Sequence, residues 1–158
     1  MKPWRVYLDT SVFGGCLDQV FAEDSLRIIA YVRAGDLLAL VSEVTLGELS
    51  SAPEEVRRIL SGLPEGNVER ADLTDDVYDL QAAYLDGGVL EPRWANDALH
   101  VAAATVSRAD AIVSWNFRHI VRLDKIKAYN RVNYEMGYGL LTILSPKEVL
   151  LDEREETE

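Results

Sequence analysis

Short runs of apolar residues alternate along the chain with longer segments in which apolar residues recur every three or four positions. The short runs have the length of buried β-strands, and the longer segments have the spacing of amphipathic helices. Strands that alternate with helices build a parallel sheet covered on both faces, so we predict a three-layer α/β/α sandwich with a central, mainly parallel sheet of four or five strands. The predicted strands are Arg5–Leu8, Leu37–Val41, Asn67–Ala71, Ala111–Ser114 and Leu141–Leu144.

Polar and glycine residues between these runs mark where the helices begin and end. Ser42 and Thr74 have the character of N-caps, and Gly35 suits the end of a helix. A loop is expected at Gly14-Gly15. The predicted helices are Asp24–Arg33, 43–50, Pro53–Leu60, 74–85, Trp94–Arg108, Phe117–Asn130 and a short one from Pro146.

The chain length of 158 residues suits one domain with one substantial core. Residues 1–150 are expected to form that domain, and 151–158 an acidic, disordered tail. One cysteine, Cys16, excludes an internal disulfide framework and suits a reducing cytoplasm. No signal peptide or membrane-spanning run is visible, so a cytoplasmic protein without a membrane partner is expected. Two histidines with that one cysteine make a zinc site a poor expectation.

The formal net charge of −11 argues against a nucleic-acid partner, because proteins that bind polyanions usually carry a basic face. The tail from Asp152 to Glu158 supplies part of this charge, with five acids against one arginine. Between Arg118 and Arg131 the sign reverses, with five basic residues against Asp124. That stretch is either a solvated helix face or a contact surface for substrate, and Arg118 and Arg122 are the candidate contacts.

Three acidic residues occupy equivalent places in the predicted topology. Asp9 ends the first strand, Glu48 lies on the helix after the second, and Asp97 lies in the first turn of the alanine-rich helix. Sites in open parallel sheets form outside the carboxyl ends of the strands, so these side chains can converge there. Each also has a structural explanation, as a cap of a turn or helix or as part of a capping box. Converging carboxylates with oxygen ligands alone would favour Mg²⁺ or Mn²⁺.

An ordered set of motifs resembles the PIN-domain (PilT N-terminal) family and spans nearly the whole chain, from Arg5 to Leu150. Any one of the motifs is weak by itself, but all of them occur in order and at suitable distances. The matching segments are Val6-Tyr7-Leu8-Asp9-Thr10-Ser11, Ser42-Glu43-Val44-Thr45-Leu46-Gly47-Glu48-Leu49, Asn96-Asp97-Ala98-Leu99-His100-Val101-Ala102-Ala103-Ala104, Ala109-Asp110-Ala111-Ile112-Val113-Ser114-Trp115-Asn116-Phe117 and Leu144-Ser145-Pro146-Lys147-Glu148.

The resemblance implies a metal-dependent nuclease that acts on RNA, often as the toxin of a toxin–antitoxin pair. It implies that Asp9, Glu48 and Asp97 are the metal-binding, catalytic acids. Ser11 and Ser114 would then offer hydroxyls to the phosphate or to a metal-bound water. A fourth acid of the family is replaced here by Asn116, or three residues later by His119. Asn116 can still coordinate through its carbonyl oxygen but adds no charge, so we predict one tightly bound ion and a weaker second.

The two histidines are assigned differently. His100 follows Asp97 by three residues and shares its helix face, so it could orient a carboxylate or carry a proton. Its alanine-rich surroundings favour a hydrogen-bonded histidine of the core. His119, in the basic stretch, is expected to meet substrate or solvent. Neither is assigned a catalytic role.

Two other functions remain in competition with the nuclease. An aspartyl-phosphate phosphatase would need a second acid two residues after Asp9, where this chain has Ser11. A PIN-like module with weakened catalysis, kept for binding protein or RNA, is the stronger alternative because of Asn116. In either PIN reading, an apolar helix face favours a homodimer. A toxin would also have a cognate antitoxin covering the acidic site.

Overall fold

The sheet at the centre of the molecule has five parallel strands. A computed structural model describes residues 2–151. Within them the strands are β1 (Trp4–Leu8), β2 (Leu37–Val41), β3 (Val68–Arg70), β4 (Ala111–Val113) and β5 (Thr142–Leu144). Their order across the sheet is β3-β2-β1-β4-β5, and every neighbouring pair is parallel. The predicted α/β class with a parallel sheet is therefore confirmed.

Strand β1 lies in the middle of the sheet and determines where the candidate site forms. Val6, Tyr7 and Leu8 are buried, and Leu8 pairs with Val113 of β4. The residues that follow β1 and β4 consequently emerge side by side at the same edge. A strand covered on both faces reads as a continuous apolar run, which is why the sequence shows it so clearly.

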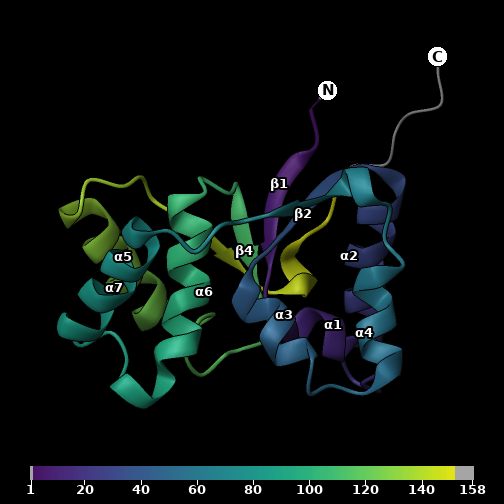
Figure 1. Cartoon of the computed structure of the whole chain (residues 1–158), viewed down its shortest axis with the longest axis horizontal. Helices are drawn as coiled ribbons and strands as arrows, with labels where there is room; N and C mark the ends of the chain where they lie inside the picture. Colours follow the sequence, from purple (N-terminus) through teal and green to yellow (C-terminus); the bar gives the residue numbers. More distant parts are fainter. Residues whose placement is uncertain (1, 152–158) are drawn as a thin grey trace.

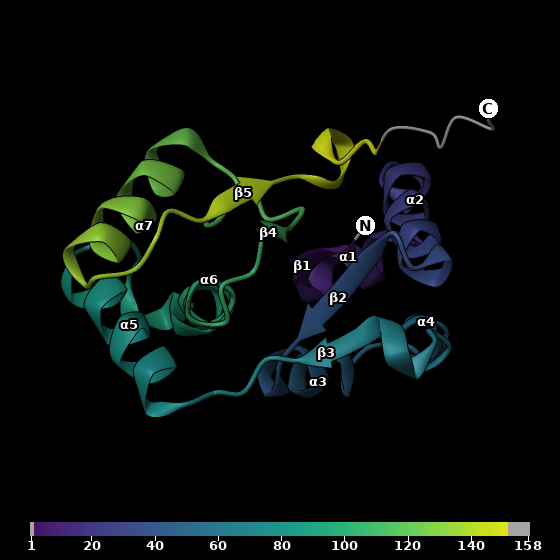
Figure 2. The same ribbon diagram turned by 90° about the horizontal axis from the view of Figure 1, so that it is seen from above.

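Helices cover both faces of the sheet, and the two sides are shown edge-on in Figure 2. One side carries α5 (Asp75–Asp86), α6 (Ala95–Val106) and α7 (Leu123–Glu135), and the other carries α1 (Thr10–Gly15), α2 (Ala22–Ala34) and α4 (Glu54–Ser61) (Figure 1). Helix α3 (Glu43–Leu49) follows β2 and packs between α1 and α6. Two separate apolar cores result, one under each helical layer. The arrangement is the predicted three-layer sandwich.

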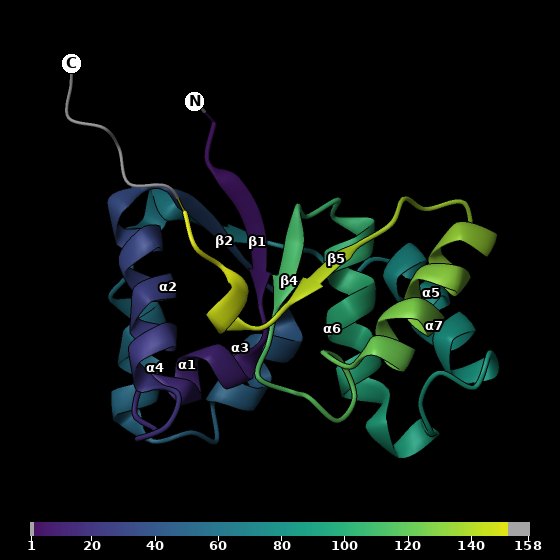
Figure 3. The ribbon, with the colours of Figure 1, turned by 180° about the vertical axis from the view of Figure 1, so that it is seen from behind.

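Helix α6 packs directly against the sheet, as the view from behind shows (Figure 3). Ala98, Ala102 and Ala103 are completely buried, and the small side chains let the helix approach the strands closely. Its N-terminal turn points toward the carboxyl ends of β1 and β4. Asp97 and His100 are thereby carried to the same edge as Asp9.

Two predicted elements were wrong. The loop expected at Gly14-Gly15 is the end of helix α1, which begins directly after Asp9. The helix expected over Phe117–Asn130 begins only at Leu123 and continues to Glu135. The Asn116 side-chain oxygen accepts hydrogen bonds from the N–H groups of Arg118 (3.2 Å) and His119 (2.9 Å), and this turn displaces the helix start. The remaining predicted elements are present with ends shifted by no more than two residues.

The short 3₁₀ helices are Glu65–Asn67, Pro92–Trp94 and Pro146–Glu148, the last of which is the predicted short closing helix. Most of the predicted acidic tail, 152–158, lies outside the described residues. Between residues 2 and 151, none of the helices is both long and apolar enough to cross a membrane.

Candidate metal centre

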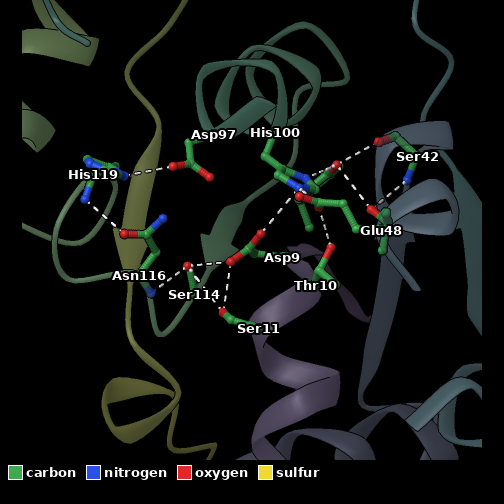
Figure 4. A network of polar contacts seen from close by, with 12 residues as sticks. Asp9, Thr10, Ser11, Ser42, Glu48, Asp97, His100, Ser114, Asn116 and His119 are labelled. Carbon is green, nitrogen blue, oxygen red and sulfur yellow. Dashed lines mark hydrogen bonds and ion pairs between the residues drawn. The ribbon is translucent and has the colours of Figure 1, made fainter. Parts of the chain in front are cut away.

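The candidate site lies at the carboxyl ends of β1 and β4, where Asp9 and Ser114 emerge next to each other (Figure 4). The Asp9 side chain is only 8% exposed. Its Oδ2 atom accepts hydrogen bonds from the hydroxyls of Ser11 (2.8 Å) and Ser114 (2.7 Å). These two bonds fix the carboxylate and turn Oδ1 toward the residues of α3 and α6.

Both serine hydroxyls are themselves held by the backbone after β4. Ser11 Oγ accepts the N–H of Trp115 (2.9 Å), and Ser114 Oγ accepts the N–H of Asn116 (2.9 Å). A hydroxyl that accepts a backbone bond directs its own proton elsewhere, here to Asp9. The family resemblance implied that these serines offer hydroxyls to the phosphate or to a metal-bound water, and that role stays a prediction. In the structure both hydroxyls donate to Asp9 Oδ2.

Glu48 and His100 face the free side of the Asp9 carboxylate. His100 Nε2 lies 2.6 Å from Glu48 Oε1 and 3.3 Å from Asp9 Oδ1. The Thr10 hydroxyl donates to the same Glu48 oxygen at 2.7 Å. The His100 side chain is fully buried, whereas that of Glu48 is 35% exposed and thus open to solvent. His100 thus bridges two carboxylates from β1 and α3.

The other ring nitrogen of His100 is held by a buried pair of hydroxyls. Tyr7 Oη lies 2.8 Å from His100 Nδ1 and 2.7 Å from Ser42 Oγ. Ser42 precedes α3, and its N–H donates to Thr45 Oγ1 at 3.2 Å, which anchors the start of the helix carrying Glu48. The contact between Tyr7 Oη and Nδ1 therefore orients the imidazole, and Nε2 is the nitrogen that faces the carboxylates.

His100 and Glu48 each shift the pKa of the other toward its charged form. Burial alone would lower the pKa of His100, but its hydrogen bond to Glu48 and the charges of Asp9, Glu48 and Asp97 raise it above its usual value. Burial would raise the pKa of Glu48, yet the hydrogen bonds from His100 and Thr10 and the charge of His100 lower it. The contact between the two side chains therefore favours the charged form of each.

Asp97 lies one helical turn before His100 and belongs to a second contact. Its Oδ2 lies 2.8 Å from His119 Nδ1. His119 is buried, and its ring packs against the Trp94 indole with centroids 4.3 Å apart. Asp97 is still close enough for its charge to raise the pKa of His100. We call Asp9, Glu48 and Asp97 the acid cluster.

The structure thus groups the predicted residues differently from the sequence. Ligand atoms of Asp9, Glu48 and His100 lie within 4.8 Å of one another, the one such group of three among the residues 2–151. The sequence assigned that third place to Asp97 and left His100 in the core. The spacing of three residues between Asp97 and His100 was the available signal, since it puts both on one helix face.

The other predicted residues lie around this group. Asn116 is placed by its turn, and its side-chain oxygen already accepts two backbone N–H groups. Arg118 and Arg122 are exposed and line a pocket beside His119. The sequence did not point to Trp94, Arg93 or Lys125 as neighbours of the site, because they come from segments that only the fold brings together.

The donor set fits a divalent cation. Two carboxylates, one of them buried, face each other across the His100 imidazole, with a third carboxylate nearby. Oxygen donors suit Mg²⁺ and Mn²⁺, and an additional imidazole nitrogen is tolerated better by the transition metal. Glu48 is the more exposed of the two facing carboxylates, with 35% of its side chain open to solvent.

The fold is similar to those of three solved structures. VapBC2 from Rickettsia felis bound to a DNA fragment from its promoter matches 89% of this chain and 98% of the other, with 13% identity and a TM-score of 0.57. FitAcB from Neisseria gonorrhoeae matches 91% and 99%, with 14% identity and a TM-score of 0.56. DNA-bound VapBC from Salmonella typhimurium matches 90% and 98%, with 16% identity and a TM-score of 0.55.

No protein-family model matches the chain, and no curated protein matches it in sequence. The structural likenesses extend over almost the full length of the matched chains. They confirm that the fold is PIN-like, as the ordered motifs of the sequence predicted.

Proposed function

We propose that this chain is a divalent-metal-dependent endoribonuclease of the PIN toxin type, which hydrolyses phosphodiester bonds of RNA. The observation that carries the proposal is the Asp9 carboxylate. Two serine hydroxyls hold its Oδ2, and its Oδ1 is turned toward Glu48 and His100. A carboxylate that two hydrogen bonds hold next to a second carboxylate is better explained by cation binding than by capping of a helix. The Asp9 side chain makes no hydrogen bond that caps α1.

Asp9 and Glu48 would hold the ion, with Asp97 supporting it from α6, and Mg²⁺ or Mn²⁺ fits these donors. When bound, such an ion polarises the phosphate and lowers the pKa of its water for in-line attack. Ser11 and Ser114 keep Asp9 in place, and Thr10 does the same for Glu48. His119 orients Asp97 through the bond to Oδ2.

Charge favours one tightly bound ion. The three carboxylates carry −3, and a single divalent ion leaves −1. Asn116 adds no charge, and its oxygen accepts the N–H groups of Arg118 and His119. One unit of charge at ~4 Å is worth roughly 4 kcal/mol per opposing charge at an effective dielectric near 20, before desolvation. A second ion therefore binds weakly or only with the substrate.

The same position supports a second candidate function. Where the family has a fourth acid, Asn116 forms a turn. A PIN-like module that has lost most of its catalysis and is retained for binding would show this arrangement. The two functions differ in whether RNA is cut when the ion is present.

The proposed partners follow from the likenesses. The matched assemblies, VapBC and FitAcB, are toxin–antitoxin complexes that contain PIN-domain toxins. We propose a cognate antitoxin that covers the acid cluster, and a homodimer as the state of the free chain. The site of action would be the cytoplasm, where RNA is the substrate.

The proposal is tested with purified wild type, Asp9→Asn and Asp79→Asn. Asp79 is exposed on α5, so its variant has the same change of charge outside the site. Each protein is incubated with an RNA pool in Mg²⁺, in Mn²⁺ and in chelator, and its melting temperature is recorded under the same conditions. The ion is expected to raise the melting temperature and permit cleavage for wild type and Asp79→Asn, and to do neither for Asp9→Asn.

Stabilisation by the ion without cleavage would favour the binding module, and Asn116→Asp then shows whether the missing acid is the reason. If the ion neither stabilises the wild type nor permits cleavage, the nuclease proposal is wrong.

A further inference from the structure

A second concave feature adjoins the acid cluster. It is a pocket of about 360 Å³ between the segment 88–94, which leads into α6, and the segment 118–125, which leads into α7. We call it the Trp94 pocket. His119 belongs to its wall and at the same time bonds to Asp97, so the pocket and the acid cluster are contiguous. Figure 4 shows His119 on the far side of Asp97 from Glu48.

The wall of the Trp94 pocket is cationic in a protein of net charge −11. Four basic side chains line it against one acid, Glu91; they are Arg93, Arg118, Arg122 and Lys125. Only part of the predicted basic stretch 118–131 lines this pocket, because Lys127 and Arg131 are not in its wall. Arg93 comes from a distant part of the sequence and completes the wall. A local concentration of positive charge beside a phosphodiester-cleaving site attracts the polyanion that the rest of the surface repels.

Basic side chains of the Trp94 pocket remain available to bind an anionic ligand. Among the ion pairs of the described residues, none involves Arg118. Arg93 pairs with Glu91 at 3.0 Å, but both side chains are about two-thirds exposed. Arg122 pairs with Asp124 through two hydrogen bonds, of 2.6 Å and 2.8 Å, and both side chains are exposed. Solvent screens exposed pairs, so these arginines can turn to a phosphate oxygen.

An aromatic surface lies inside this cationic wall. The Trp94 indole is partly buried, and the guanidinium carbons of Arg93 and Arg118 lie 4.9 Å and 5.4 Å from its ring centroid. Guanidinium groups and nucleobases are both flat and both stack on aromatic rings. A base can therefore displace an exposed guanidinium and leave it free to bind a phosphate.

We infer that the Trp94 pocket binds one unpaired nucleotide next to the scissile phosphate, with its base on Trp94 and its phosphate on Arg118 and Arg122. The inference rests on the proposed nuclease function and makes the substrate single-stranded RNA. The volume is at the lower end of that found for small-ligand sites and suits a single nucleotide. In a duplex the faces of the bases are stacked, so a base reaches Trp94 only if it is unpaired.

Binding in chelator separates this inference from catalysis, because the strand is held without being cut. A labelled, unstructured oligoribonucleotide and its duplex are titrated with wild type, Trp94→Phe, Trp94→Leu and Arg118→Gln, with fluorescence anisotropy as readout. Stacking of one base is lost with Trp94→Leu, so single-strand binding is expected to weaken about tenfold. Trp94→Phe keeps a ring and is expected to weaken binding by about threefold or less. Duplex binding is expected to stay unchanged in both variants.

Salt dependence distinguishes the base contact from the phosphate contact. Arg118→Gln is expected to reduce the slope of log affinity against log salt by about 0.7, the value for one phosphate contact of a single strand. Trp94→Leu is expected to leave that slope unchanged. The matched control is Arg58→Gln on α4, an exposed arginine on the opposite helical layer, which is expected to change neither affinity nor slope beyond error.

Three results would overturn the inference: no single-strand binding by wild type, equal binding by wild type and Trp94→Leu, or equal losses for single strand and duplex. If Trp94→Leu does not fold, as its melting curve shows, Arg118→Gln decides, and an unchanged salt slope then counts against the pocket. The nuclease proposal is judged separately by cleavage. Wild type that cuts RNA without using Trp94 refutes only the pocket, and Trp94-dependent binding without cleavage refutes only the nuclease.

Discussion

The acid cluster and the Trp94 pocket lie next to each other and share His119, but their side chains are held in opposite ways. Asp9 and His100 are buried, and each polar atom of their side chains has a hydrogen-bond or ion-pair partner, supplied by β1, α1, α3, α6 or the turn after β4. Arg93, Arg118 and Arg122 are exposed and extend from connecting segments. One region is fixed by the fold, and the other is adaptable.

The difference corresponds to two physical requirements. Groups that hold an ion must keep a fixed spacing, and burial with multiple hydrogen bonds supplies it. Groups that meet a strand of variable sequence must adjust, and long side chains on loops do so at little energetic cost. We therefore expect substitutions in the acid cluster to affect the stability of the protein, and substitutions in the Trp94 pocket to affect binding alone.

The largest effect on stability is expected for His100→Leu in chelator. The leucine is apolar and leaves Asp9 facing Glu48 without the intervening positive charge. Removing one partner of a buried ionic network should lower the free energy of unfolding by about 3 kcal/mol, measured by urea denaturation. Addition of Mg²⁺ should restore part of the loss, because a cation again separates the carboxylates. A loss under 1 kcal/mol would show that the cluster is not held by its charges.

A smaller loss is expected behind the acid cluster, at Gly15. A Cβ there would collide with the Ser25 hydroxyl and lie 2.7 Å from Nε1 of Trp115. The backbone N–H of Trp115 is the group that donates to the Ser11 hydroxyl. Gly15→Ala should therefore destabilise the protein by about 2 kcal/mol through overpacking. Gly14→Ala is the matched control, since nothing lies within 4 Å of the added carbon. It should leave stability equal or raise it by up to ~1 kcal/mol, as alanine favours the helix.

Ser114→Ala removes a hydroxyl that holds Asp9 and that also accepts the N–H of Asn116. The hydroxyl is buried and donates to Asp9 Oδ2 at 2.7 Å. Loss of a hydrogen bond to a charged acceptor should lower the free energy of unfolding by about 1.5 kcal/mol. In the presence of the ion, a weaker shift of the melting temperature than in wild type would show that Ser114 acts through Asp9. An unchanged shift would refute that positioning role.

The smallest effect is expected in the Trp94 pocket. Arg122 and Asp124 are both exposed, so Arg122→Gln should leave the free energy of unfolding unchanged within the error of the measurement. The same substitution should weaken binding of the single strand in low salt. A stability loss comparable to that of Ser114→Ala would remove the contrast between the two regions.

The sequence predicted those parts of the molecule that local patterns determine. Buried parallel strands appear as unbroken apolar runs, so β1 and β2 were found, and Asp9 was placed correctly at the end of β1. The capping residues Ser42 and Thr74 marked the helices that follow them. The PIN-like fold followed from the order of the motifs and is confirmed by the structural likenesses.

The remainder depends on contacts between distant segments or on local competition. His100 meets Asp9 and Glu48 only because α6 packs against β1 and α3, which spacing within α6 does not determine. The Trp94 pocket is lined by two segments far apart in the sequence. After Asn116, a hydrogen bond from the His119 N–H to the Asn116 side chain forms a turn where the residue spacing had predicted a helix. The metal roles of Asp9, Glu48, Asp97 and Asn116 stay predictions until an ion is measured.

The strand order also determines when during synthesis the site can exist. Asp9 is made well before Asp97, Ser114 and His119, and β1 pairs with β4. Pairing over such a separation must await both segments. Until Asp97 and β4 have been made, a growing chain has no complete acid cluster beside the RNA of the ribosome. For a ribonuclease, this topology would act as a delay, which keeps the unfinished protein harmless to the machinery that is producing it.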